Sequence, residues 1–168
     1  MSIDPEPLLT SPWVYVALVA LILCDVYLPV LPSGTTLGLA TVYAHSGHHS
    51  VALLWLIGAG ASTVGDFLAF RAVRRGSGRI RSLLARNRRI AQADARVRDM
   101  LRRRTIRTVM LARFLPAGRC LATVGCGSDP RIAWRRFQTG SALAAVAWST
   151  YTVGVGYLNA LLFHTSWL

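Results

Sequence analysis

The sequence contains no lysine and only seven acidic residues, so all 19 basic residues are arginine and the net charge is +12. A charge of this size is typical of nucleic-acid-binding proteins. However, no aromatic residue that would stack on a base occurs between Phe70 and Phe114. Fourteen arginines fall between Arg71 and Arg107, next to long apolar stretches. This distribution predicts a cytoplasmic segment of a membrane protein and no nucleic-acid partner.

Cysteine and histidine are also scarce. The three cysteines, Cys24, Cys120 and Cys126, have no regular spacing, which excludes a disulfide framework and a zinc motif. Three histidines lie in His45–Ser50 without a nearby carboxylate, which favours a polar turn over a metal site. We therefore expect no metal and no cofactor. An enzyme is the least supported class, because no nucleophile–base pair or nucleotide-binding loop is found.

The first eleven residues contain acids and no arginine, so the charged n-region of a secretory signal peptide is missing. The rest of the chain is apolar, with 53% hydrophobic residues and a mean hydropathy of +0.42, which indicates a membrane protein. About three spanning helices are predicted, over Pro12–Leu28, Val51–Val73 and Phe137–Gly156. The segment Tyr157–Leu168 is too short to cross alone. It either extends the last helix at a tilt or lies at the interface.

One apolar stretch, Ala112–Pro130, has a composition that an uninterrupted spanning helix would avoid. Proline and glycine disrupt helix interiors, and arginine at bilayer depth is costly and usually functional. Irregular backbone at that depth is tolerated only where protein buries it or water lines it. We therefore expect a re-entrant segment that forms an anion site. The residues in question are Arg113, Pro116, Gly118, Arg119, Gly125 and Gly127.

An earlier stretch repeats this pattern. Leu31–Val42 reads LPSGTTLGLATV, and Leu115–Val124 reads LPAGRCLATV. Thr35 of the first copy falls where Arg119 sits in the second. Interrupted apolar segments in corresponding halves are typical of transporters built from inverted repeats. The first re-entrant candidate is therefore residues 31–44, which the prolines Pro29 and Pro32 introduce, although chance similarity of two Pro-Gly loops is an alternative.

These observations predict an all-α integral membrane protein with inverted repeats and two re-entrant Pro/Gly hairpins. The chain forms a single domain, residues 1–168. It begins with a tail, 1–11, and a first half, 12–73. A basic cytoplasmic segment, 74–107, precedes the second half, 108–168, which holds the re-entrant segment 112–130. The arginines place the second hairpin's opening toward the cytoplasm and the first toward the outside.

The basic segment Arg74–Arg107 has an imperfect apolar stripe on a helix-compatible sequence. One interpretation is a solvated cytoplasmic linker. The other, which the one-signed charge favours, is an amphipathic hairpin that lies on anionic lipid headgroups. The sequence leaves a homo-oligomer open.

Three motifs together resemble the DedA family, the bacterial branch of a superfamily that includes the SNARE-associated Golgi proteins. They are GDFLAFRAVRRGSG, then ARFLPAGR followed by glycine, then FQTGSALAAVAW with a later Gly-Tyr pair. The resemblance covers roughly Asp25 to Tyr157. It implies inverted repeats with two re-entrant hairpins. It also implies translocation of a polyprenyl-phosphate carrier lipid, such as undecaprenyl or decaprenyl phosphate, across the bacterial cytoplasmic membrane for envelope synthesis.

The resemblance also assigns roles to single residues. Arg113 and Arg119 match the family's two essential arginines. Asp25 matches the acid before the first hairpin, and Asp66 matches the Gly-Asp of the middle span. The family usually has a second acid where this chain has Gly34 and Thr35, so proton coupling either is lost or falls to Asp25 and Asp66.

The chemistry of the predicted site is phosphate binding. Arginine's planar fork matches phosphate bidentately and keeps its charge. Arg113 and Arg119 flank a break at Pro116 and converge on one phosphate, with Gly118 allowing close backbone approach. Asp25 and Asp66 either pair with these arginines in the empty site, take up a proton during the cycle, or merely order the fold. Pro29, Pro32, Gly34, Pro116 and Gly125 shape the hairpins.

Three functions are compatible with this site. The first is a polyprenyl-phosphate flippase. The second is a general phospholipid scramblase or a proton-coupled solute transporter that uses the same residues. The third is a scaffold that transports nothing and recruits anionic lipids through its basic segment. Dependence of transport on the two arginines separates the first two from the third.

Overall fold

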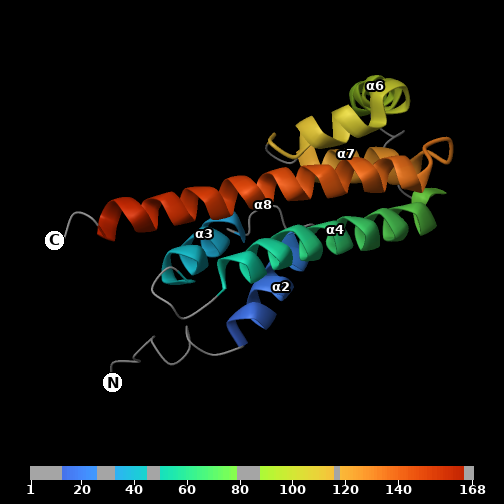
Figure 1. Ribbon diagram of the computed structural model, residues 1–168. Coiled ribbons are helices and arrows are strands. Elements are labelled where there is room, and N and C mark those ends of the chain that lie inside the picture. The colour runs from blue at the N-terminus through green and yellow to red at the C-terminus, as the bar shows by residue number, and fades with distance from the viewer. Residues whose placement is uncertain (1–12, 26–32, 45–49, 79–87, 116–117, 165–168) are drawn as a thin grey trace. The chain divides into compact units, whose positions relative to one another are not determined.

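The computed structural model describes residues 13–25, 33–44, 50–78, 88–115 and 118–164, with the backbone alone for residues 88–96 and 163–164. Within these ranges the chain forms six helices and no strands, which confirms the all-α prediction (Figure 1). The helices are α2 (Trp13–Asp25), α3 (Ser33–Tyr43), α4 (Val51–Arg75), α6 (Arg88–Ala112), α7 (Gly118–Ser128) and α8 (Trp134–His164).

The helices belong to two compact units. The first unit contains α2, α3, the part of α4 up to Ser62 and the part of α8 from Ala145. The second unit, Thr63–Ala144, contains the rest of α4, then α6, α7 and the start of α8. Each unit has its own hydrophobic core.

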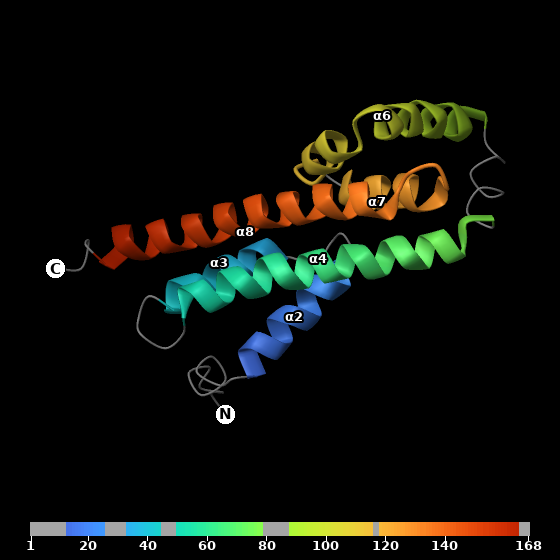
Figure 2. The same ribbon diagram turned by 45° about the vertical axis from the view of Figure 1, so that its right-hand side comes forward.

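The core of the first unit joins all of its helices, through Leu18 of α2, Leu37 of α3, Leu54 of α4 and Val153 of α8. Helices α2 and α3 pack against each other (Figure 2). Side-chain hydrogen bonds add to this packing, because Trp55 Nε1 donates to Thr150 Oγ1 at 2.9 Å and Ser149 Oγ donates to the Trp55 carbonyl at 2.8 Å. A Cβ at Gly58 would lie 2.6 Å from Ser149 Oγ, so glycine allows this close approach.

In the second unit, α6 and α7 lie side by side (Figures 1 and 2). Their approach is close, since a Cβ at Gly125 would lie 2.6 Å from Leu101 Cδ1. Helix α6 is kinked at Arg104, whose backbone is not helical. Beside the kink, Thr105 Oγ1 donates to the Leu101 carbonyl at 2.6 Å, a side-chain bond that often bends helices. Phe70 stacks on Phe137 at 4.8 Å in the core.

One helix of the described residues, Val51–Arg75, is both long enough and apolar enough to cross a membrane. It coincides with the span predicted over Val51–Val73. Helix α2 has 13 residues, a length of about 20 Å, and its predicted end near Leu28 lies outside the described residues. The last helix begins at Trp134 and continues to His164, so residues 157–164 extend it. That α2 and α8 also cross the membrane stays a prediction.

The repeated Leu-Pro-x-Gly motif corresponds to two helices of equal length. Helices α3 and α7 have eleven residues each and begin at or one residue before the motif glycine, Gly34 in the first and Gly118 in the second. Both also contain a threonine that bonds one turn back: Thr41 Oγ1 donates to the Leu37 carbonyl at 2.8 Å and Thr123 Oγ1 to the Arg119 carbonyl at 2.9 Å. The repeat therefore extends to the local structure, while a re-entrant course in the membrane stays a prediction.

Several helices combine a buried apolar core with exposed large apolar side chains. Large apolar side chains such as Leu56, Leu68 and Leu121 are exposed. Polar side chains such as Ser62 and Ser141 are buried. Soluble monomers rarely expose much contiguous apolar surface, so these helices have the surface expected beside lipid.

Candidate functional site

Two arginines of the second unit converge on one carboxylate. Arg113 Nη1 lies 3.1 Å from Asp66 Oδ2, and Arg119 Nε lies 2.7 Å from Asp66 Oδ1. Helix α4 carries Asp66, α7 carries Arg119, and Arg113 directly follows α6. The structure therefore brings the two arginines that were predicted to bind phosphate together with Asp66, which was predicted to pair with them or to carry a proton.

The break between α6 and α7 sets the directions of the two arginines. After Ala112 the chain turns, with Leu115 N donating to the Ala112 carbonyl at 3.1 Å and Gly118 N donating to the Leu115 carbonyl at 2.9 Å. A Cβ at Gly118 would collide with the Ala112 carbonyl oxygen, so this turn requires glycine. The close approach at Gly118 is therefore to the chain's own backbone. That Gly118 also lets a phosphate approach the backbone closely stays a prediction.

A hydroxyl group completes the surroundings of Asp66. Ser141 Oγ of α8 donates to Asp66 Oδ2. One turn away, Gln138 Nε2 donates to the Thr63 carbonyl at 3.2 Å and joins the same two helices. The sequence analysis did not single out Ser141 and missed this hydrogen bond. Ser141 stands in the sequence Phe-x-x-Gly-Ser, and no local signal separates it from the other hydroxyl residues of α8.

The charges of this cluster are buried. Exposed fractions of the side chains are 3% for Asp66, 6% for Arg113 and 15% for Arg119. Buried ions are stable only when they are paired and hydrogen-bonded, because their desolvation is costly. Arginine cannot shed its charge in these surroundings, so both guanidinium groups need anionic or polar partners in every state of the protein. The cluster thus combines two buried guanidinium groups with one carboxyl group.

The remaining predicted site residues lie elsewhere. Asp25 is the last residue of α2, and Gly34 is in α3, so both belong to the first unit. Gly34 faces the ring of Trp148 at ordinary contact distance. Gly125 packs against α6, and its role in a hairpin stays a prediction. The three prolines of the hairpins, Pro29, Pro32 and Pro116, lie outside the described residues.

The described residues contain no group of three histidine, cysteine or carboxylate side chains that could hold a metal ion. The histidines of His45–Ser50 lie outside the described residues, so the prediction for that turn is untested.

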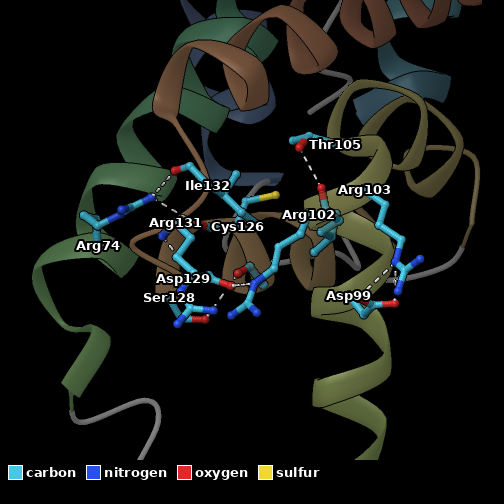
Figure 3. A network of polar contacts seen from close by, with 12 residues as sticks. Arg74, Asp99, Arg102, Arg103, Thr105, Cys126, Ser128, Asp129, Arg131 and Ile132 are labelled. Atoms are coloured by element: carbon cyan, nitrogen blue, oxygen red, sulfur yellow. Dashed lines mark hydrogen bonds and ion pairs between the residues drawn. The ribbon is translucent and has the colours of Figure 1, made fainter.

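A second buried acid, Asp129, follows the end of α7 and was not singled out from the sequence. It accepts hydrogen bonds from Arg102 Nε of α6 and, at 3.0 Å, from the backbone N–H of Arg131 (Figure 3). Burial raises the pKa of Asp129, but the hydrogen bonds from Arg102 and Arg131 outweigh it, so the pKa lies below its ordinary value. This ion pair ties the loop between α7 and α8 to α6.

Comparison with known proteins gives one match. A family model described as the VTT domain matches residues 12–158, nearly the whole chain. The VTT domain is that of the SNARE-associated and DedA superfamily, which is the resemblance that the sequence motifs indicated. No curated protein and no solved structure matches the chain. Proteins with this domain are membrane proteins and are commonly transporter-like.

Proposed function

Because the chain belongs to the VTT-domain family, we propose that it translocates an anionic polyprenyl-phosphate carrier lipid across the bacterial cytoplasmic membrane for envelope synthesis. The phosphate is held by Arg113 and Arg119. The observation that carries this proposal is the convergence of both guanidinium groups, from the two sides of the α6–α7 break, on the buried carboxylate of Asp66.

The proposed mechanism is an exchange of anions. A lipid phosphate that crosses about 30 Å of hydrocarbon needs a cationic partner throughout. In the empty site, Asp66 pairs with the two guanidinium groups, fixes their orientation and keeps them out of contact with lipid. An incoming phosphate offers them more acceptor oxygens than a carboxylate does, and each arginine has five N–H donors for the two partners. Ser141 keeps a hydrogen bond to Asp66 while the arginines turn to the substrate.

The geometry of α7 supports this assignment further. Arg119 is the second residue of α7, so its backbone lies in the first turn, where helix N–H groups and the helix dipole favour an anion. An eleven-residue helix rises about 16 Å, half of the hydrocarbon thickness. A re-entrant course for α7 would carry its N-terminus to mid-membrane depth. Helix α3 has the same length, which supports a re-entrant course for it as the inverted counterpart of α7.

We assign Asp25 to the coupling of this cycle, together with Asp66. The family's second acid is absent, because Gly34 and Thr35 stand in its place, so these two aspartates are the acids left to carry a proton. The basic segment, residues 74–107, then faces the cytoplasm and contacts anionic headgroups.

The test measures translocation of a short-chain polyprenyl phosphate in liposomes that contain the purified protein. The variant is Arg113→Ala/Arg119→Ala, and the single variant Arg119→Ala is measured beside it. The matched control is Arg103→Ala, which removes an exposed arginine paired with Asp99 on the surface of α6. We expect selective transport by the wild type and the control, and none by either site variant, with all proteins inserted to the same extent.

Other outcomes assign other functions. Equal movement of many phospholipids, still dependent on the arginines, would identify a general scramblase. Full transport by Arg119→Ala would remove that residue from the mechanism. If the folded wild type moves no lipid and no proton-coupled solute, the chain is a scaffold.

A further inference from the structure

A second cationic site lies in the second unit, at the end of α4. It is a cavity of about 720 Å³, within the usual range of ligand sites. Arg71, Arg74 and Arg75 form its charged wall, and no acidic residue is among the described residues that line it. The remaining lining is apolar, and half of its residues are aromatic: Phe67, Phe70 and Trp134.

One of the three arginines is a fixed charge. Arg74 Nη2 donates to the Ile132 carbonyl at 2.9 Å and to the Cys126 carbonyl at 3.2 Å (Figure 3). Its guanidinium lies 4.8 Å from the centroid of the Phe70 ring. Arg74 therefore satisfies a carbonyl in the last turn of α7 and cannot leave the cavity wall without losing that contact.

The other two arginines, Arg71 and Arg75, are exposed at the cavity, and Arg71 lies beside an aromatic ring. Arg71 lies 5.5 Å from the centroid of the Phe67 ring, and Phe67 meets Trp134 edge-on at 6.1 Å. The Trp134 side chain is half exposed. Cations and aromatic faces thus share one surface, which suits a ligand that has both a negative charge and an apolar part.

The position of the cavity identifies the source of such a ligand. Its arginines occupy the last turns of α4, the one described helix that is long and apolar enough to cross a membrane. Arginine and tryptophan at the ends of a span lie at the level of the lipid headgroups. We propose that this cavity binds the phosphate headgroup of an anionic phospholipid, with the start of an acyl chain against Phe67 and Trp134. This site is distinct from the Asp66 cluster, because its lining includes none of Asp66, Arg113 and Arg119.

The test measures ligand binding to the purified full chain by native mass spectrometry. The probes are phosphatidylglycerol, phosphatidylcholine and inorganic phosphate. The variant Arg71→Gln/Arg75→Gln removes two exposed charges from the cavity and leaves Arg74 in place. The control Arg104→Gln/Arg107→Gln removes two exposed charges from α6, outside the cavity. Monodispersity and thermal midpoint show that both variants are folded.

We expect the wild type to prefer phosphatidylglycerol over phosphatidylcholine. The cavity variant should bind phosphatidylglycerol about 30-fold more weakly, from roughly two arginine contributions near a lipid surface. Arg104 and Arg107 belong to the basic segment that contacts headgroups, so the control should also lose affinity, but clearly less than the cavity variant. Equal weakening in both variants would mean general attraction by the basic segment and would overturn the site. If inorganic phosphate competes for the cavity as strongly as phosphatidylglycerol does, the ligand is a soluble phosphate and the lipid assignment is overturned. None of these results bears on transport by Arg113 and Arg119, because neither residue is changed.

Discussion

Arg119 Nε lies 2.7 Å from Asp66 Oδ1, although 52 residues separate the two in the chain. The acid comes from α4, the one helix among the described residues that is long and apolar enough to cross a membrane. The arginine comes from the first turn of the short helix α7. Arg113 binds the other carboxylate oxygen. Asp66 thus contacts both arginines, one through each carboxylate oxygen.

The first prediction concerns the stability of this cluster. Asp66→Asn leaves two buried guanidinium groups without their carboxylate, and loss of one partner of a buried pair costs about 3–5 kcal/mol. The measurement is the free energy of unfolding in mixed micelles. The control is Asp99→Asn, whose carboxylate pairs with Arg103 on the exposed surface of α6 and should contribute about 1 kcal/mol or less. Equal losses in the two variants would refute a structural role for the buried pair.

The second prediction separates charge from geometry at Arg119. The variant Arg119→Lys keeps the positive charge and loses the planar fork that binds a carboxylate and a phosphate together. Loss of one charge-assisted hydrogen bond, about 1.5–3 kcal/mol, predicts translocation slowed by about tenfold or more. The assay is lipid translocation in liposomes, with Arg103→Lys as the control that should transport normally. Wild-type rates in Arg119→Lys would mean that a point charge is sufficient.

The third prediction compares the two motif glycines. A Cβ at Gly118 collides with the backbone oxygen of Ala112, whereas the nearest atom to a Cβ at Gly34 is in the Trp148 ring at 3.7 Å. Gly118→Ala should therefore lower stability by about 1–3 kcal/mol and disturb both arginines. Gly34→Ala should change it by about 0.5 kcal/mol or less. The measurement is the thermal midpoint of each purified variant. Similar midpoints for Gly118→Ala and Gly34→Ala would contradict the close contact between Gly118 and the Ala112 carbonyl.

The fourth prediction is a pH dependence that Asp129 causes. Because hydrogen bonds from Arg102 and Arg131 lower the pKa of Asp129 in the folded state, its contribution to stability is present above the unfolded value, about 4. That contribution is lost as the pH falls through the lowered folded pKa. Asp129→Asn should therefore be less stable than wild type at pH 7, and the difference should shrink below about pH 4. A constant difference in thermal midpoint from pH 7 to pH 3 would show that ionisation of Asp129 contributes nothing.

Several features were predictable because they depend on local composition. The helix Val51–Arg75 follows from an apolar run bounded by a polar turn and arginines. The break before Gly118 follows from Pro116, since proline cannot continue a helix. The choice of Arg113, Arg119 and Asp66 also came from the sequence, because isolated charges in apolar segments are costly and are rarely kept without a function.

Other features required side-chain packing between distant segments. Nothing local indicated that Ser141 would bond Asp66, because serine is also a common small residue at helix contacts. Asp129 resembled an ordinary turn residue until α6 supplied Arg102. The cavity at the end of α4 requires Trp134 to pack beside Phe67, although Trp134 comes 67 positions later in the chain.

By itself, the sequence determined the all-helical class, the position of the clearest span, the repeated Pro-Gly breaks and the family, since each depends on residue type and spacing along the chain. The tertiary structure alone decided which charges meet. It assigned both arginines of the break to Asp66, Arg102 to Asp129 and Arg74 to the carbonyls of Cys126 and Ile132. The physical reason is that 19 arginines and few acids allow many pairings, and only the packing of the helices selects among them.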